Sequence, residues 1–149
     1  MTDDGPLIVG IGNPFRSDDG VGPYVAGKLG ERGFRIVTHE GDGTGLMDLF
    51  EKHASLILID ATLSGKKPGT LTRFDAIAER LPAELFHYST HRFGLAEAVE
   101  TARTLGQLPG GLMVYGIEGG DFAAGTELSP LVRAAAGELV TMLAAGQAG

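Results

Sequence analysis

The sequence contains no cysteine. Disulfide frameworks, thiolate zinc sites, iron-sulfur clusters and cysteine nucleophiles are therefore excluded. Long apolar runs are also missing, since no run approaches the roughly 18 residues that a membrane-spanning helix needs. No basic segment precedes an apolar stretch near the first residues, as it would in a secretory signal. The sequence predicts a cytoplasmic protein that makes no contact with a membrane.

Positive charge is scarce as well. The sequence has twelve Lys and Arg residues and nineteen Asp and Glu residues, which gives a formal net charge of -7. The basic residues form no run longer than the pair Lys66-Lys67. A surface of this charge repels nucleic acid phosphates, so we expect no nucleic acid partner.

The remaining composition is that of an ordinary globular protein. Hydrophobic residues make up 43% of the 149 residues and charged residues 21%. These values argue against disordered and fibrous classes. The length fits one domain of typical size, so we expect a single domain over residues 1–149. A monomer is taken as the default oligomeric state.

Short apolar runs alternate with segments in which apolar residues recur at helical spacing. The last helix is marked most clearly, with Ser129 as its N-cap, Pro130 at its first position and an apolar stripe of Leu131, Ala135, Leu139 and Leu143 up to Gly146. The expected strands are 7–11, 34–38, 55–61, 70–74 and 112–116. The other expected helices are 21–29, 46–52, 76–80 and 94–105, with a tight loop at 41–45.

This alternation predicts a three-layer α/β fold. Strand-helix-strand units form right-handed crossovers, so the sheet is expected to be mostly parallel and twisted, with about five strands and with helices on both faces. Ligands of such sheets bind beyond the carboxyl ends of the strands.

Three polar clusters are expected at or near that edge: the loop 12–20, Asp60 and the sequence Ser89-Thr90-His91. Asp60 follows four apolar residues, and an ionised carboxylate there is costly unless it is paired or binds a metal. It could cap a loop or pair with Arg16 or Arg92.

The other members of these clusters also have ordinary explanations. Asp18 and Asp19 could cap the following helix, and His91 could be a hydrogen-bonded loop histidine. Taken together, however, two carboxylates and an imidazole form a ligand set that suits nickel or zinc. Three protein ligands would leave positions on the metal open for another molecule.

Other chemistries lack their defining residues. The sequence has no His-Glu-x-x-His, no Gly-x-Ser-x-Gly and no phosphate-binding P-loop. Gly10-Ile11-Gly12 begins a dinucleotide fingerprint, but Phe15 stands where the third glycine belongs. A zincin, a serine hydrolase and a P-loop enzyme are therefore excluded, and a nucleotide site is disfavoured.

Residues 10–22, which read Gly-Ile-Gly-Asn-Pro-Phe-Arg-Ser-Asp-Asp-Gly-Val-Gly, closely resemble the N-terminal signature of the hydrogenase maturation endopeptidases. The similarity continues in the same order through Leu58 to Ala61, Ser89 to His91, and Gly116 to Pro130. It covers nearly the whole chain.

The resemblance implies that Asp19, Asp60 and His91 are metal ligands. It further implies an endopeptidase that recognises nickel already inserted in the precursor of a nickel-iron hydrogenase large subunit, and that then removes a C-terminal extension. Nickel would be carried by this partner, and zinc or cadmium could replace it in the isolated protein. In many relatives a glutamate stands at the position of Asp19.

The general base is left open by a second departure from the family. Many members carry an Asp-Gly-Gly-Thr loop whose Asp is suspected in catalysis, whereas this chain reads Glu-Gly-Asp-Gly-Thr-Gly from Glu40 to Gly45. Either Glu40 or Asp42 could be the catalytic carboxylate. The missing nucleophile also leaves two alternatives: a noncatalytic metal-binding module, or an enzyme of similar architecture that handles nucleosides or phosphate.

Overall fold

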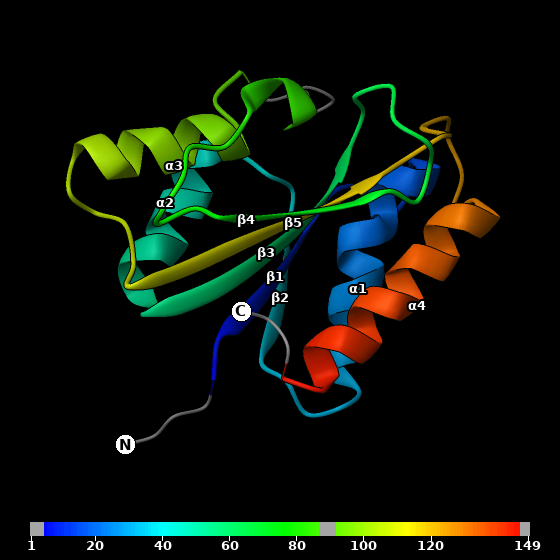
Figure 1. Ribbon diagram of the computed structural model, residues 1–149, viewed down its shortest axis with the longest axis horizontal. Helices are drawn as coiled ribbons and strands as arrows, with labels where there is room; N and C mark the ends of the chain where they lie inside the picture. Colours follow the sequence, from blue (N-terminus) through cyan, green and yellow to red (C-terminus); the bar gives the residue numbers. More distant parts are fainter. Residues whose placement is uncertain (1–4, 87–91, 147–149) are drawn as a thin grey trace.

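The computed structural model describes residues 5–86 and 92–146, and its five strands form one sheet (Figure 1). The strands lie in the order β2-β1-β3-β5-β4, and all neighbours are parallel except β4, which is antiparallel to β5. The expected mostly parallel sheet of five strands is confirmed. The strands are β1 (Leu7–Ile11), β2 (Ile36–His39), β3 (Ser55–Thr62), β4 (Leu71–Asp75) and β5 (Gly111–Glu118).

Helices cover both faces of this sheet, as expected. In Figure 1, α1 and α4 lie together on one face, and α2 and α3 lie on the other. The helices are α1 (Val21–Gly30), α2 (Gly43–Lys52), α3 (Leu95–Thr104) and α4 (Pro130–Ala144), with the 3-10 helices η1 (Ser17–Gly20) and η2 (Ala83–Phe86).

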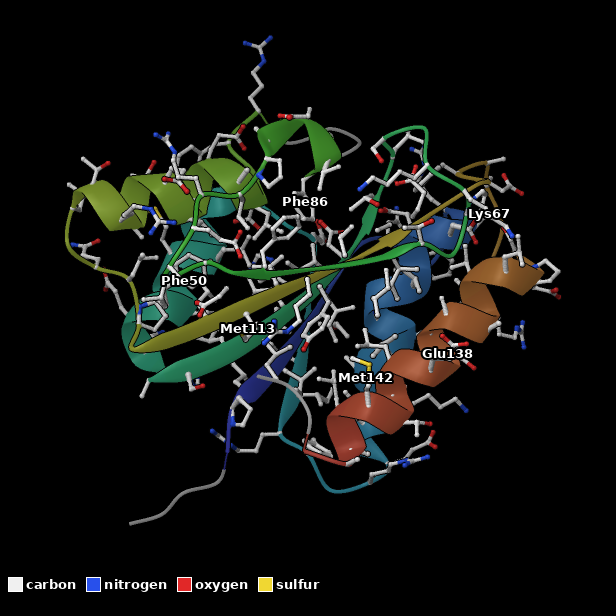
Figure 2. The ribbon with its side chains drawn as sticks, in the orientation of Figure 1. Phe50, Lys67, Phe86, Met113, Glu138 and Met142 are labelled. Atoms are coloured by element: carbon white, nitrogen blue, oxygen red, sulfur yellow. The ribbon has the colours of Figure 1, made fainter. Side chains whose placement is uncertain are left out.

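Each face of the sheet has its own hydrophobic core, and the alternation of side chains along β1 shows the division. Val9 belongs to the same core as Phe50 of α2, whereas Ile8 belongs to the core that contains the buried residues of α1 and α4. Figure 2 shows Phe50 and Met142 on opposite sides of the sheet. A strand buried on both faces must be apolar at every position, which explains the unbroken run in β1.

The connections create a cleft between β1 and β3. From β1 the chain crosses through α1 to β2 on one side, and then through α2 to β3 on the other side. The loops after β1 and β3 therefore diverge, as they do at the ligand-binding crevice of other open α/β sheets.

Two predicted boundaries near this cleft were displaced. Strand β2 begins at Ile36, two residues later than expected, and ends at His39. Helix α2 begins at Gly43 instead of Leu46, because the Asp42 side chain accepts a hydrogen bond from Gly45 N–H and caps the helix earlier. Two of the three glycines of the expected loop, Gly43 and Gly45, thus lie in the first turn of α2.

The prediction of a helix at 76–80 is wrong. The carbonyl of Asp75 accepts hydrogen bonds from Ala78 and Glu79, and its carboxylate accepts one from Ile77, which forms a turn instead. In α4, Leu131 is 49% exposed and does not belong to the buried stripe. The buried face instead includes Val132, Ala136 and Val140, together with the expected Ala135, Leu139 and Leu143.

No helix within residues 5–86 and 92–146 combines the length and the apolarity needed to cross a bilayer.

Candidate active site

A cavity of about 440 Å³ opens at the carboxyl ends of β1 and β3. Its walls come from the loop after β1, the residues that follow β2, the end of β3, the end of η2 and the start of α3. Three carboxylates belong to these walls: Asp19, Glu40 and Asp60. The structure thus brings together three of the five residues that the sequence predicted for the site.

Asp60 lies in β3 with only 9% of its surface exposed. Its side chain accepts a hydrogen bond from the N–H of Ala61 at 2.8 Å. Burial, and then the negative charge of Asp19, raise the pKa of Asp60 well above its ordinary value. The carboxylate is therefore poorly stabilised as an anion by the protein alone, and a cation in the cavity would relieve both effects.

Asp19 lies in η1, and its carboxylate accepts a hydrogen bond from the N–H of Asn13 at 2.9 Å. Burial raises the pKa of Asp19, although the bond from Asn13 and the charge of Arg16 oppose that effect. Two partly desolvated carboxylates that repel each other in one cavity form an oxygen donor set for a divalent cation.

Gly12 allows the loop after β1 to make this arrangement. Its φ of 141° lies in a region that residues with a side chain rarely adopt, and a Cβ atom there would collide with the carbonyl oxygen of Asp19. The backbone of the loop can therefore fold back against Gly12 only because this residue lacks a side chain.

The two candidates for the general base have different environments. Glu40 is exposed and belongs to the cavity wall. Asp42 caps α2 through Gly45 N–H at 3.0 Å, contacts the Thr44 hydroxyl at 3.4 Å and lies 3.9 Å from His39 Nε2. The carboxylate of Asp42 thus has a structural role, while Glu40 is a lining residue of the cavity.

Asp18 has a role that sequence reasoning missed. It is fully buried, and instead of capping α1 it accepts hydrogen bonds from the backbone N–H groups of Gly120, Asp121 and Ser129 and from the Ser129 hydroxyl. Burial by itself raises the pKa of Asp18, but the bonds from Ser129, Gly120 and Asp121 outweigh it and hold this pKa below its ordinary value. The residue types alone did not distinguish Asp18 from Asp19, and only the resemblance to the family selected Asp19.

The prediction for His91 lies outside the described residues, as do Ser89 and Thr90. Within the described part of the chain, no group of three or more His, Asp and Glu side chains is arranged to hold a metal ion. Asp19 and Asp60 are therefore the two predicted metal ligands whose surroundings the structure describes.

Apolar side chains complete the cavity. Phe15 is 68% exposed at its wall, whereas Phe86 and Leu95 are buried. Phe86 is the last residue of η2, and Figure 2 shows it on the side of η2 that faces the sheet. A cleft with carboxylates on one part of its surface and aromatic or aliphatic groups on another can hold an extended peptide and a cation together.

The chain was compared with known protein families and structures. Residues 39–145 match the family model described as "Hydrogenase maturation protease". That match covers well over half of the chain and includes Glu40 and Asp60. The protein belongs to the hydrogenase maturation protease family.

Two curated relatives are hydrogenase expression/formation proteins. HupD of Rhodobacter capsulatus is 29% identical over 119 residues, which cover 75% of this chain and 56% of HupD. HoxM of Azotobacter vinelandii is 30% identical over 125 residues, which cover 79% of this chain and 59% of HoxM. The chain thus spans less than two thirds of the length of these relatives.

Solved structures of the family share the fold. The hydrogenase maturating endopeptidase HybD from E. coli superimposes with a TM-score of 0.77 at 25% identity, over 94% of this chain and 90% of HybD. The [NiFe] hydrogenase maturation protease HybD from Thermococcus kodakarensis gives a TM-score of 0.68 at 25% identity, over 96% of this chain and 98% of that protein.

Proposed function

We propose that this protein is an endopeptidase that removes the C-terminal extension of a nickel-loaded hydrogenase large-subunit precursor. Membership of the hydrogenase maturation protease family supports the class of substrate. One observation carries the finer proposal: the buried carboxylate of Asp60 shares a cavity with Asp19, whose negative charge disfavours the ionised form of Asp60.

Nickel belongs to the substrate in this proposal. Asp19 and Asp60, with His91, would bind the nickel ion that the precursor already carries, and thereby hold the precursor against the cavity. Neutralising two desolvated carboxylates is an interaction that a nickel-free precursor does not offer. Affinity for the precursor therefore depends on nickel, and premature cleavage is avoided.

We assign the role of general base to Glu40. Its carboxylate would accept a proton from a water molecule as the oxygen of that water attacks the carbonyl carbon of the scissile peptide bond. The proton would then pass to the departing nitrogen as the C–N bond breaks, which leaves a new C-terminal carboxylate on the subunit and a free amine on the tail. Asp42 is assigned to capping α2 instead, because its oxygens are already used there.

The apolar wall has a separate role. Phe15, Phe86 and Leu95 would receive side chains of the extended tail next to the scissile bond. Because Phe15 is the most exposed of the three, it is the residue that a bound peptide would cover most.

Mass spectrometry of a nickel-loaded precursor tests this proposal. Wild-type protein should shorten the precursor to one defined product, whereas Asp60→Asn and His91→Ala should leave it intact. Tight binding of the precursor without any change in its mass would instead identify a noncatalytic metal-binding module. If wild type and both variants gave the same result, the proposed role of the metal site would be wrong.

A further inference from the structure

Two segments that are far apart in the sequence are held together by hydrogen bonds, and one of them lines the cavity. The loop 13–20, which carries Asp19, is joined to residues 119–129, which connect β5 to α4. The family model matches residues 39–145 and so includes only the second segment, whereas only the first contributes residues to the cavity wall. The second segment can therefore act on the cavity only through its contacts with the first.

Backbone contacts form the first part of the connection. The N–H of Ser17 donates to the carbonyl of Gly125 at 2.9 Å, the N–H of Gly125 donates to the carbonyl of Phe15 at 2.9 Å, and the N–H of Asp18 donates to the carbonyl of Asp121 at 2.8 Å. Ser17 has a φ of 53°, in the left-handed region that residues other than glycine rarely adopt. Its hydroxyl also donates to the carbonyl of Ala123 at 2.7 Å.

The carboxylate of Asp18 forms the second part. It accepts hydrogen bonds from the N–H groups of Gly120 at 2.8 Å, Asp121 at 2.9 Å and Ser129 at 2.7 Å, and from the Ser129 hydroxyl. Ser129 is the N-cap residue of α4, but its side chain makes no capping bond to that helix. The hydroxyl serves the contact with Asp18 instead.

This contact fixes the direction of the next residue. Asp18 and Asp19 are consecutive in the 3-10 helix η1, where successive side chains project about 120° apart. With Asp18 held by residues 119–129, the side chain of Asp19 is directed to the cavity, where Asn13 N–H holds one of its oxygens.

We infer that Asp18 is a positioning residue for the metal ligand Asp19, and that Ser129 and the segment 119–129 supply the fixed support against which it acts. This inference rests on the proposed function, because it takes Asp19 to be a ligand of nickel. Groups that orient a metal ligand change metal affinity by about 10- to 100-fold when they are removed.

Glu118 provides a matched control. It is also a buried carboxylate, with 1% of its surface exposed, and it also accepts four hydrogen bonds: from the Thr62 and Ser64 hydroxyls and from the N–H groups of Ser64 and Gly65. These bonds hold the loop between β3 and β4, and not the loop that carries Asp19. Loss of Glu118 should therefore affect stability without reorienting Asp19.

The experiment measures the affinity of the full chain for Ni²⁺ alone by calorimetry, beside thermal melting of each variant. Asp18→Asn should bind Ni²⁺ about 10- to 100-fold more weakly than wild type. Glu118→Gln should lower the melting temperature but keep the wild-type affinity. Ser129→Ala should weaken binding in the same direction as Asp18→Asn, while Ser129→Thr, which retains the hydroxyl, should restore it.

Wild-type affinity in a folded Asp18→Asn variant would overturn the inference. If Asp18→Asn does not fold, equal affinities of Ser129→Ala and Ser129→Thr would overturn it. A wild-type protein that cleaves the precursor but binds no Ni²⁺ would also contradict it, while leaving the proposed protease activity in place. Conversely, the predicted affinities in a protein that does not cleave would support the positioning role and refute only the proposed reaction.

Discussion

Asp42 accepts a hydrogen bond from the backbone N–H of Gly45 at 3.0 Å, and this contact begins α2 three residues before the position expected from hydrophobic periodicity. Glu40, only two residues earlier, belongs to the cavity wall. Two carboxylates that are equivalent candidates in the sequence thus have separate roles in the structure.

The first prediction follows from this difference. Glu40→Gln should lower the rate of precursor cleavage by about 100-fold or more, which is the size of effect expected for a general base. Melting temperature should be unchanged, because Glu40 is exposed. The rate is measured by mass spectrometry at saturating precursor.

Asp42 supplies the control for this prediction. Asp42→Ala should lower the free energy of unfolding by about 1 kcal/mol through loss of the N-cap. It should still cleave the precursor at a rate near that of wild type once the fraction of folded protein is matched. A loss of cleavage in folded Asp42→Ala together with normal cleavage by Glu40→Gln would reverse the assignment.

A second prediction concerns Phe15. Its side chain is 68% exposed at the cavity wall, and contact with an apolar group of the tail would bury it. Phe15→Ala should raise KM for the precursor about tenfold, because burial of a large apolar side chain contributes about 1.5–3 kcal/mol. Neither the melting temperature nor the affinity for Ni²⁺ should change.

Leu105→Ala is the matched control for Phe15. Leu105 is 58% exposed just after α3, and it does not belong to the cavity wall. The KM of this variant should equal that of wild type. A similar rise in KM for both variants would show that the effect of Phe15 is not specific to the site.

A third prediction concerns pH and Glu118. Burial raises the pKa of Glu118, but hydrogen bonds from Ser64, Thr62 and Gly65 outweigh it and place this pKa below the ordinary value of 4.5. Glu118 therefore stabilises the folded protein above about pH 4.5, and this contribution is lost as pH falls through the lowered pKa. Urea unfolding between about pH 6 and pH 3 should show a smaller loss of stability with acid in Glu118→Gln than in wild type. Equal losses would contradict this assignment.

A fourth prediction concerns two glycines of α1. A Cβ atom on Gly22 would collide with the carbonyl oxygens of Ile11 and Ile59, whereas a Cβ atom on Gly27 would meet no atom within 4 Å. Gly22→Ala should therefore lower the free energy of unfolding by about 1–3 kcal/mol. Gly27→Ala should raise it by about 0.5–1 kcal/mol, because alanine is the better helix former. Chemical denaturation of both variants measures the difference, and equal effects would contradict the close packing of α1 on β1 and β3.

Much of the fold could be predicted from the sequence. The limits of β1 and the helices α1, α3 and α4 follow from apolar periodicity and from caps such as Ser129 and Pro130. The turn at 76–80 could not be predicted in the same way, because Asp75 binds three following N–H groups in a pattern that competes with a helix. The exposure of Leu131 depends on how α4 is rotated against α1, which the periodicity of α4 alone does not fix.

The candidate site was predictable only in part. Asp60 is recognisable because a carboxylate interrupts an apolar strand, and the structure places it in one cavity with Asp19. The roles of Asp18 and Asp42 depend on contacts with Ser129 and Gly45 that no local pattern distinguishes from those of their acidic neighbours. Residue types and spacing show which residues can carry charge, but without the resemblance to the family they do not show which of two adjacent acids faces a cavity.

The dependence of cleavage on nickel tests the central claim most directly. The same large-subunit precursor, prepared with and without nickel, is incubated with wild-type protein and followed by mass spectrometry over time. We predict that the nickel-loaded precursor loses its C-terminal extension while the nickel-free precursor keeps its full mass. Cleavage of both forms at the same rate would contradict the claim that Asp19 and Asp60 recognise the substrate through its metal.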